Sequence, residues 1–120
     1  MLKNLKILFV EDDNNTRNFI SLLLSSAVKE IITAQDGVEG LEKYEKYNPD
    51  IVLTDITMPK MDGFTMSKKI KEINPNQIII VMSAHDKEEN INISKEIGIR
   101  EFISKPVDVE YLKSILINCI

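Results

Sequence analysis

The sequence predicts an α/β fold in which five helices pack on both faces of a five-stranded parallel sheet. Five short apolar runs alternate with segments whose apolar residues recur at helical spacing, which is the pattern of consecutive βα units. The run from Ile78 to Met82 contains no polar residue, as expected of a strand that is buried on both faces. Four of the runs end at a charged or hydroxyl residue, and such residues suit the rim of a parallel sheet better than its core.

The first half of the chain is expected to supply strands at residues 6–10, 30–33 and 51–54. The helix between the first two has one apolar stripe, made of Thr16, Phe19, Ile20, Leu23 and Leu24. The next helix begins at Asp36-Gly37-Val38-Glu39, which resembles a capping box, and ends at Asn48-Pro49. Its inward side chains are predicted to be Val38, Leu41 and Tyr44.

The second half repeats this alternation. A third helix begins at Gly63 and ends at Asn74-Pro75. Its inward stripe is predicted to be Phe64, Ser67, Ile70 and Ile73. A fourth helix is expected from an N-cap at Asp86, with a reciprocal Glu89, to a C-cap at Gly98. A fifth strand at residues 100–103 precedes a last helix after Pro106. The inward residues of that helix are predicted to be Val109, Leu112, Ile115, Leu116 and Cys119.

Composition excludes several classes of protein. With 120 residues, the chain is expected to form one domain, residues 1–120. A net charge of -4 without a basic run argues against direct binding of nucleic acid. No apolar stretch approaches the length of a membrane span, and the N-terminus lacks the apolar region of a signal peptide. Cys119 is the only cysteine, so a reducing cytoplasmic location is expected.

The residues at the strand ends predict one composite site. Glu11 and Asp12 follow the first strand, Asp55 the third, Ser83 the fourth and Lys105 the fifth. Carboxylates brought together repel one another, and a cation relieves that repulsion. Oxygen ligands without His or Cys indicate a hard divalent ion, and the small number of carboxylates favours Mg²⁺ over Ca²⁺.

The same residues suit phosphoryl transfer. Ser83 and Lys105 can bind phosphoryl oxygens, and an aspartate can act as the nucleophile that forms an aspartyl-phosphate. Asp55 needs no separate general base, because its carboxylate is already deprotonated at neutral pH.

Four motifs in this order resemble the receiver domain of two-component response regulators. They are Val10-Glu11-Asp12-Asp13, Leu53-Thr54-Asp55-Ile56-Thr57-Met58-Pro59 with Met61-Asp62-Gly63, Met82-Ser83-Ala84 and Phe102-Ile103-Ser104-Lys105-Pro106. The resemblance covers Leu5 to about Asn118. It implies a flavodoxin-like, doubly wound sheet with strand order 2-1-3-4-5.

The resemblance also implies a role for each site residue. Asp55 would accept phosphate from a sensor histidine kinase or phosphotransfer protein. Glu11, Asp12, Asp55 and the backbone carbonyl of Thr57 would hold Mg²⁺. Ser83 and Phe102 would be the switch pair, and Lys105, followed by a cis bond to Pro106, would pair with the phosphate. The domain would not be a conventional enzyme, although it would phosphorylate itself from a phosphodonor and dephosphorylate itself.

The implied output is a change in the surface of the fourth helix, fifth strand and fifth helix. A downstream effector protein, or an effector domain elsewhere in a longer protein, would read that surface, and a phosphorylation-dependent dimer is left open. Glu11, Ser83 and Phe102 depart from the commoner Asp, Thr and Tyr of the family. Thr57 and His85 occupy positions that tune the lifetime of the phosphate in this family, in a direction that one sequence does not give.

Three other functions fit the sequence less well. A flavodoxin-like cofactor carrier shares the topology, but its first loop must cradle a phosphate, which the acids at residues 11–13 would repel. A phosphatase with an aspartyl nucleophile resembles Asp-x-Asp, whereas Thr57 holds the second of these positions. A scaffold that is never phosphorylated would not need the intact acid cluster or Lys105.

Overall fold

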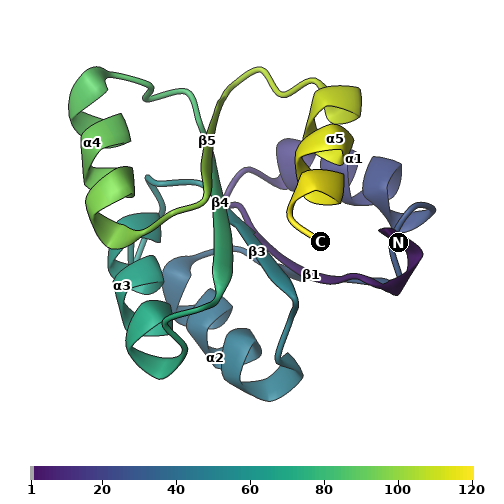
Figure 1. The fold of residues 1–120 in the computed structure, drawn as a ribbon, viewed down its shortest axis with the longest axis horizontal. Helices are drawn as coiled ribbons and strands as arrows, with labels where there is room; N and C mark the ends of the chain where they lie inside the picture. The colour runs from purple at the N-terminus through teal and green to yellow at the C-terminus, as the bar shows by residue number, and fades with distance from the viewer. Residues whose placement is uncertain (1) are drawn as a thin grey trace.

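The computed structural model describes residues 2–120, and they form one twisted parallel sheet with helices on both faces (Figure 1). The strand order is β2-β1-β3-β4-β5, so the predicted fold class and topology are confirmed. The strands are β1 (Lys6–Val10), β2 (Glu30–Ala34), β3 (Ile51–Thr54), β4 (Ile78–Ser83) and β5 (Glu101–Ser104). The helices are η1 (Leu2–Asn4), α1 (Asn14–Ser25), α2 (Gly37–Tyr47), α3 (Gly63–Ile73), α4 (Glu88–Ile97) and α5 (Val109–Asn118).

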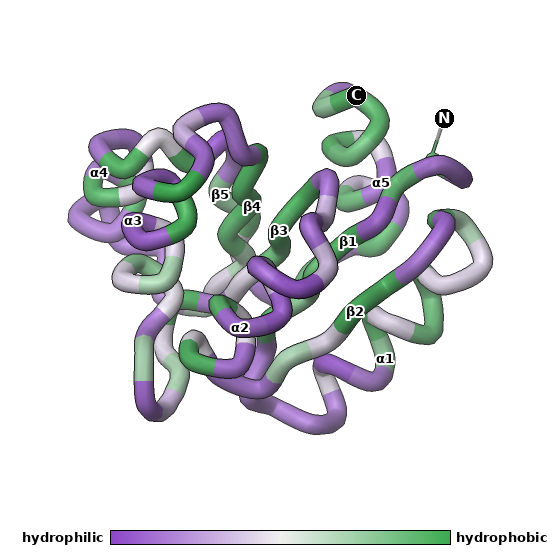
Figure 2. Tube along the Cα trace, turned by 90° about the horizontal axis from the view of Figure 1, so that it is seen from below, coloured by the Kyte–Doolittle hydropathy of each residue, from purple (hydrophilic) through white to green (hydrophobic). Residues whose placement is uncertain are grey.

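Two apolar cores lie on opposite faces of the sheet. Successive residues of a strand point to opposite faces, so Ile7 and Phe9 of β1 enter one core while Leu8 and Val10 enter the other. Helices α1 and α5 cover the first core, and α2, α3 and α4 lie over the second (Figure 1). In Figure 2 the apolar strands β3 and β4 run between two layers of helices, each of which carries both hydrophilic and hydrophobic residues.

The sheet order places a reversal next to β1. The chain goes from β1 outward to β2 and then returns to the other side of β1 with β3. Parallel sheets of this kind leave a crevice beyond the carboxyl ends of the strands at such a point. Register fixes its floor, because Val10 of β1 is paired with Thr54 of β3. The residues that follow these two, Glu11 and Asp55, are therefore neighbours at the rim.

Aspartate side chains begin four of the five α-helices. Asp13, Asp36, Asp62 and Asp108 have extended backbones, and their carboxylates accept hydrogen bonds from backbone N–H groups of the first turn. The predicted capping box is only half formed, since the Glu39 carboxylate accepts from the N–H of Gln35 rather than from that of Asp36.

Helix α4 begins differently from the prediction. Its N-cap is Lys87, which makes no side-chain hydrogen bond, and not Asp86. The backbone stays extended through Lys87, so the Asp86 carboxylate lies one residue too early to meet the free N–H groups. The helix ends as predicted at Gly98, whose φ of 92° favours glycine.

Three side chains predicted to point inward are exposed: Phe19, Val38 and Ile73. Helix α1 faces the sheet through Ile20 and Leu24, and Phe19 lies about 100° round the helix from Ile20. Helix α2 approaches the sheet through Gly40 instead of Val38, since a Cβ at Gly40 would lie 3.0 Å from Cγ2 of Val10 in β1 and 2.7 Å from Sδ of Met66 in α3. Ile73 is the last residue of α3, whose buried face is centred on earlier residues. Strand ends shift by one residue, with β2 reaching Ala34 and β5 beginning at Glu101.

No helix within residues 2–120 combines the length and the apolar character that crossing a membrane requires.

Candidate functional site

The acidic residues at the ends of β1 and β3 meet in one cluster, and we call the site formed by this cluster the pocket. Ligand oxygens of Glu11, Asp12 and Asp55 all lie within 4.8 Å of one another. Glu11 is buried, Asp12 is exposed and Asp55 is intermediate, so the trio opens to solvent on one side. Three carboxylate oxygens at this spacing, with room for water on the Asp12 side, match the oxygen donors and partial hydration that Mg²⁺ takes in proteins. The predicted magnesium site therefore fits the residues present.

The backbone holds the two sheet-end acids in register. The N–H of Asp55 donates to the carbonyl of Val10 over 3.1 Å, and the N–H of Glu11 donates to the carbonyl of Ala34 over 3.0 Å. These bonds extend the strand ladders by one residue beyond the hydrophobic runs. Asp55 also accepts a hydrogen bond from the N–H of Ile56, which is 2.6 Å from its Oδ1. The second oxygen, Oδ2, stays on the pocket side.

Lys105 reaches this pocket from the end of β5. Its Nζ lies 2.5 Å from Glu11 Oε1 and 2.9 Å from Asp55 Oδ2. The peptide bond between Lys105 and Pro106 is cis, as the sequence motif implied. One ammonium among three carboxylates leaves the pocket with an excess of negative charge, which a divalent cation would offset.

The pKa values of Glu11 and Lys105 follow from this arrangement. Burial raises the pKa of the Glu11 carboxyl above its ordinary value, and the hydrogen bond from Lys105 only partly offsets it. Burial acts to lower the pKa of Lys105, but hydrogen bonds to Glu11 and Asp55 outweigh it and raise that pKa. Lys105 therefore stays charged at neutral pH.

The remaining predicted site residues lie on or after β3, β4 and β5. Ser83 is fully buried at the end of β4, and its Oγ accepts a hydrogen bond from the N–H of His85 over 3.0 Å. Phe102 is partly buried on β5, where it is paired with Val81. Thr57 is exposed in the loop that follows Asp55. No hydrogen bond within residues 2–120 joins Ser83, Phe102 or Thr57 to the acidic trio.

Two supporting residues were not predicted from the sequence. Nη1 of Arg17 donates to the Glu11 carbonyl over 2.8 Å, which holds the loop after β1. An arginine on a helix surface is too common to have suggested this contact. Gly63 backs Asp55 at the start of α3, where an added Cβ would lie 1.9 Å from the Asp55 carbonyl oxygen. The motif Asp62-Gly63 was recognised, but sequence alone did not indicate the close approach of the two backbones.

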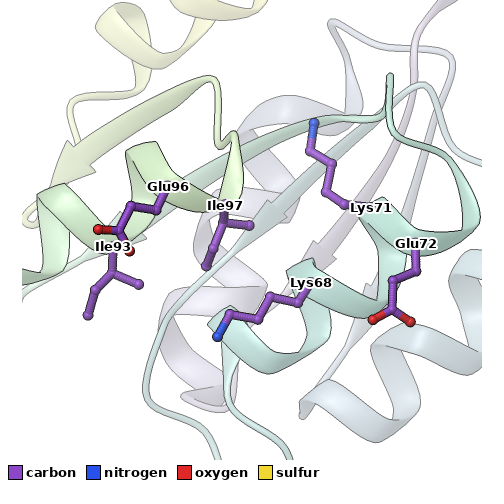
Figure 3. A pocket seen from close by; sticks show the side chains of 6 residues that line it. All are labelled: Lys68, Lys71, Glu72, Ile93, Glu96 and Ile97. Atoms are coloured by element: carbon purple, nitrogen blue, oxygen red, sulfur yellow. The ribbon is translucent and has the colours of Figure 1, made fainter.

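Two hollows of similar size differ in their relation to the pocket. One of about 450 Å³ is adjacent to it and is lined by Thr16, Phe19, Ile20, Ala84, Lys105, Pro106 and Val107. The other, of about 460 Å³, lies between α3 and α4 and is lined by Lys68, Lys71, Glu72, Ile93, Glu96 and Ile97 (Figure 3). The first hollow shares Lys105 with the site, whereas the second contains none of the predicted site residues.

Comparison with known proteins gives one consistent assignment. The profile of the response regulator receiver domain matches residues 7–117. The chemotaxis protein CheY of Treponema pallidum is 41% identical over 86% of this chain and 74% of its own length. CheY of Bacillus subtilis is 35% identical over 88% of both chains.

A solved structure adds a liganded relative. The CheX-CheY-BeF3-Mg complex of Borrelia burgdorferi contains a chain that superposes with a TM-score of 0.89 at 35% identity. The superposition covers 95% of this chain and 87% of that one. That complex contains magnesium, and the acidic trio of the present chain is suited to the same ion.

Proposed function

This chain belongs to the family of response regulator receiver domains, and we propose that its signalling chemistry takes place on Asp55. A receiver domain accepts phosphate and is not a classical enzyme. The observation that carries the proposal is that Asp55 belongs to the acidic trio and also lies 2.9 Å from the Lys105 ammonium. No other aspartate of the described chain shares both features.

Each residue of the pocket has a defined task in phosphoryl transfer. An oxygen of Asp55 forms the new bond to phosphorus, while the bond to the donor's leaving atom breaks and that atom keeps the electron pair. Lys105 neutralises charge on the phosphoryl oxygens. Glu11, Asp12, Asp55 and the Thr57 carbonyl would hold Mg²⁺, which supplies further charge neutralisation when bound. Little other chemistry is required, because this transfer depends mainly on positioning and electrostatics.

Ser83 and Phe102 form the proposed switch. Ser83 ends the strand next to β3 and carries a hydroxyl able to donate to a phosphoryl oxygen. Phosphorylation adds negative charge and acceptor oxygens, which draw this hydroxyl toward Asp55. Phe102 on the adjacent strand then fills the space that is vacated. The charge shifts the balance between two packings of the α4-β5-α5 surface, and a partner that prefers one of them reads the signal.

Histidine kinases are the phosphodonor partners of receiver domains. The hollow of about 450 Å³ next to the pocket forms a groove that suits the contact. Phe19 is 60% exposed on α1, and it lines this groove together with Pro106 and Lys105. A protein donor must bring its phosphohistidine to Asp55 and thus cover the rim that includes Lys105. An apolar side chain beside that rim adds buried area to the encounter. The output partner is an effector protein or domain, and the net charge of -4 argues against direct nucleic-acid binding.

Phosphorylation with a small donor tests the acceptor. Incubation with Mg²⁺ and acetyl phosphate is expected to add one acid-stable, hydroxylamine-labile phosphate, detected as a mass increase. Asp55→Asn removes the acceptor and should abolish the label. Asp86→Asn makes the same exchange at an exposed loop position and should leave the label intact. Persistence of the label in Asp55→Asn, or a parent protein that neither takes up label nor hydrolyses the donor, would contradict the proposal.

A further inference from the structure

A chain of three hydrogen bonds connects Ser83 to helix α4. Ser83 Oγ accepts from the N–H of His85 over 3.0 Å. The carbonyl of His85 accepts from Nδ2 of Asn90 over 3.0 Å. The carbonyl of Asn90 in turn accepts from Oγ of Ser94 over 3.0 Å. This series of hydrogen bonds runs from the rim of the phosphorylation pocket, through the loop after β4, into the first two turns of α4.

Helix α4 is the α-helix most loosely attached to the sheet. Within the described residues it buries only Ser94, whereas each of the other α-helices buries at least two residues. Its N-cap Lys87 provides no side-chain hydrogen bond. The Asn90 side chain therefore makes the one side-chain hydrogen bond that ties α4 to the loop before it among residues 2–120.

We propose that Asn90 is a positioning residue that couples the Ser83 hydroxyl to the first turn of α4. The inference rests on the proposed role of Ser83 as the hydroxyl that moves toward phosphorylated Asp55. A serine hydroxyl has one donor and two acceptor sites, so Ser83 donates to a phosphoryl oxygen while it still accepts from His85. Its movement then carries His85, and the bond from Asn90 Nδ2 makes α4 follow.

The coupling depends on the donor group of Asn90 and not on its size. Aspartate at this position has nearly the same shape, but its carboxylate accepts hydrogen bonds and donates none at neutral pH. A carboxylate facing the carbonyl of His85 would repel it, so the loop and the helix would move independently. Asn92 is exposed two residues further along α4, and no side-chain hydrogen bond is found there, which makes it a matched control.

The test measures phosphorylation and helix movement separately. Amide chemical shifts of residues 88–90 would be recorded before and after phosphorylation with acetyl phosphate and Mg²⁺, and Asp55 phosphate would be quantified by mass. In Asn90→Ala and Asn90→Asp we expect phosphate incorporation close to that of the parent, with the shift changes in α4 reduced about two-fold or more. Asn92→Ala should behave like the parent. If Asn90→Ala does not fold, Asn90→Asp decides.

The outcomes separate two kinds of failure. Parent-sized shift changes in phosphorylated Asn90→Asp would overturn the coupling and leave the role of Asp55 intact. A parent protein that takes up no phosphate would overturn the proposed function itself. A purely structural role of Asn90 would lower the unfolding midpoint without changing the phosphorylation-induced shifts, and that result would also overturn the coupling.

Discussion

The Nζ atom of Lys105 lies 2.9 Å from Oδ2 of Asp55, although 50 positions separate the two residues in the chain. The contact spans three neighbouring strands, because Lys105 follows β5 and Asp55 follows β3, with β4 between them. It places a positive charge beside an oxygen of the proposed phosphate acceptor. The ammonium therefore competes with a metal ion for the same carboxylates.

Replacing Lys105 is expected to strengthen magnesium binding while it weakens phosphorylation. In Lys105→Gln the carboxylates lose a competing charge, so the Kd for Mg²⁺ should fall by roughly five- to tenfold. Phosphate incorporation should slow, because no ammonium neutralises the phosphoryl oxygens. Titration calorimetry gives the Kd, with Lys60→Gln, at an exposed lysine outside the trio, as the control. Weaker Mg²⁺ binding in Lys105→Gln would contradict this account.

Magnesium should stabilise the folded chain through Asp12. A ligand at 100 times its Kd adds about 2.7 kcal/mol to the free energy of unfolding. Asp12 is exposed, so Asp12→Asn is expected to leave the magnesium-free protein as stable as the parent and to remove most of this gain. Urea unfolding with Mg²⁺ and with a chelator measures both quantities. The control Asp86→Asn should retain the full stabilisation by Mg²⁺. An equal stabilisation of Asp12→Asn by Mg²⁺ would exclude Asp12 as a ligand.

Two glycines should respond to alanine in different ways. At Gly63 a Cβ would collide with the Asp55 carbonyl, so Gly63→Ala is expected to cost about 2–3 kcal/mol and to slow phosphorylation roughly ten- to hundred-fold. At Gly98 a Cβ would lie 3.7 Å from Cε of Lys71, an ordinary van der Waals contact, and only the φ of 92° opposes a side chain. Gly98→Ala should cost about 1 kcal/mol and leave the phosphorylation rate unchanged. Equal effects on rate would show that Gly63 does not position Asp55.

The buried phenol of Tyr44 should make the folded chain less stable at alkaline pH. Tyr44 Oη donates to Gln77 Oε1 over 2.9 Å, and burial raises the pKa of Tyr44 above its ordinary value of 10.0. The unfolded chain therefore loses this proton first, so the free energy of unfolding falls as pH rises above about 10 toward the folded-state value.

Tyr44→Phe should cost about 1 kcal/mol at pH 7 and remove this part of the alkaline loss. Urea unfolding between neutral and alkaline pH measures both effects. Tyr111→Phe changes a tyrosine that is 52% exposed and should reproduce the parent at each pH. An unchanged alkaline slope in Tyr44→Phe would assign that loss to other groups.

The sheet and the pocket could be predicted from sequence because both depend on short-range patterns. Each strand is a compact apolar run, and the residue that follows it lies at the rim in any parallel sheet. The parallel register then needs only the strand order to bring Glu11, Asp55 and Lys105 together. The aspartate N-caps were also partly predictable, since a carboxylate satisfies free N–H groups of the first turn.

Long-range packing decided the features that the sequence did not predict. Helical spacing placed Phe19 and Val38 in the core, but the faces of α1 and α2 are set by what the sheet accepts, which is Ile20 in one case and Gly40 in the other. Asp86 is of a residue type favoured at N-caps, but it does not cap α4 because the loop stays extended for one further residue. No local signal marked Arg17 as the donor to the Glu11 carbonyl.

The single buried side chain of α4 has a thermodynamic consequence. The amides of this helix should exchange with deuterium by local opening, at a free-energy cost far below that of global unfolding, whereas those of β4 should exchange only near the global limit. Rearranging α4 disturbs the second core only through partly buried side chains such as Ile97, so the chain should pass through repeated rounds of modification and hydrolysis with little change in its melting temperature.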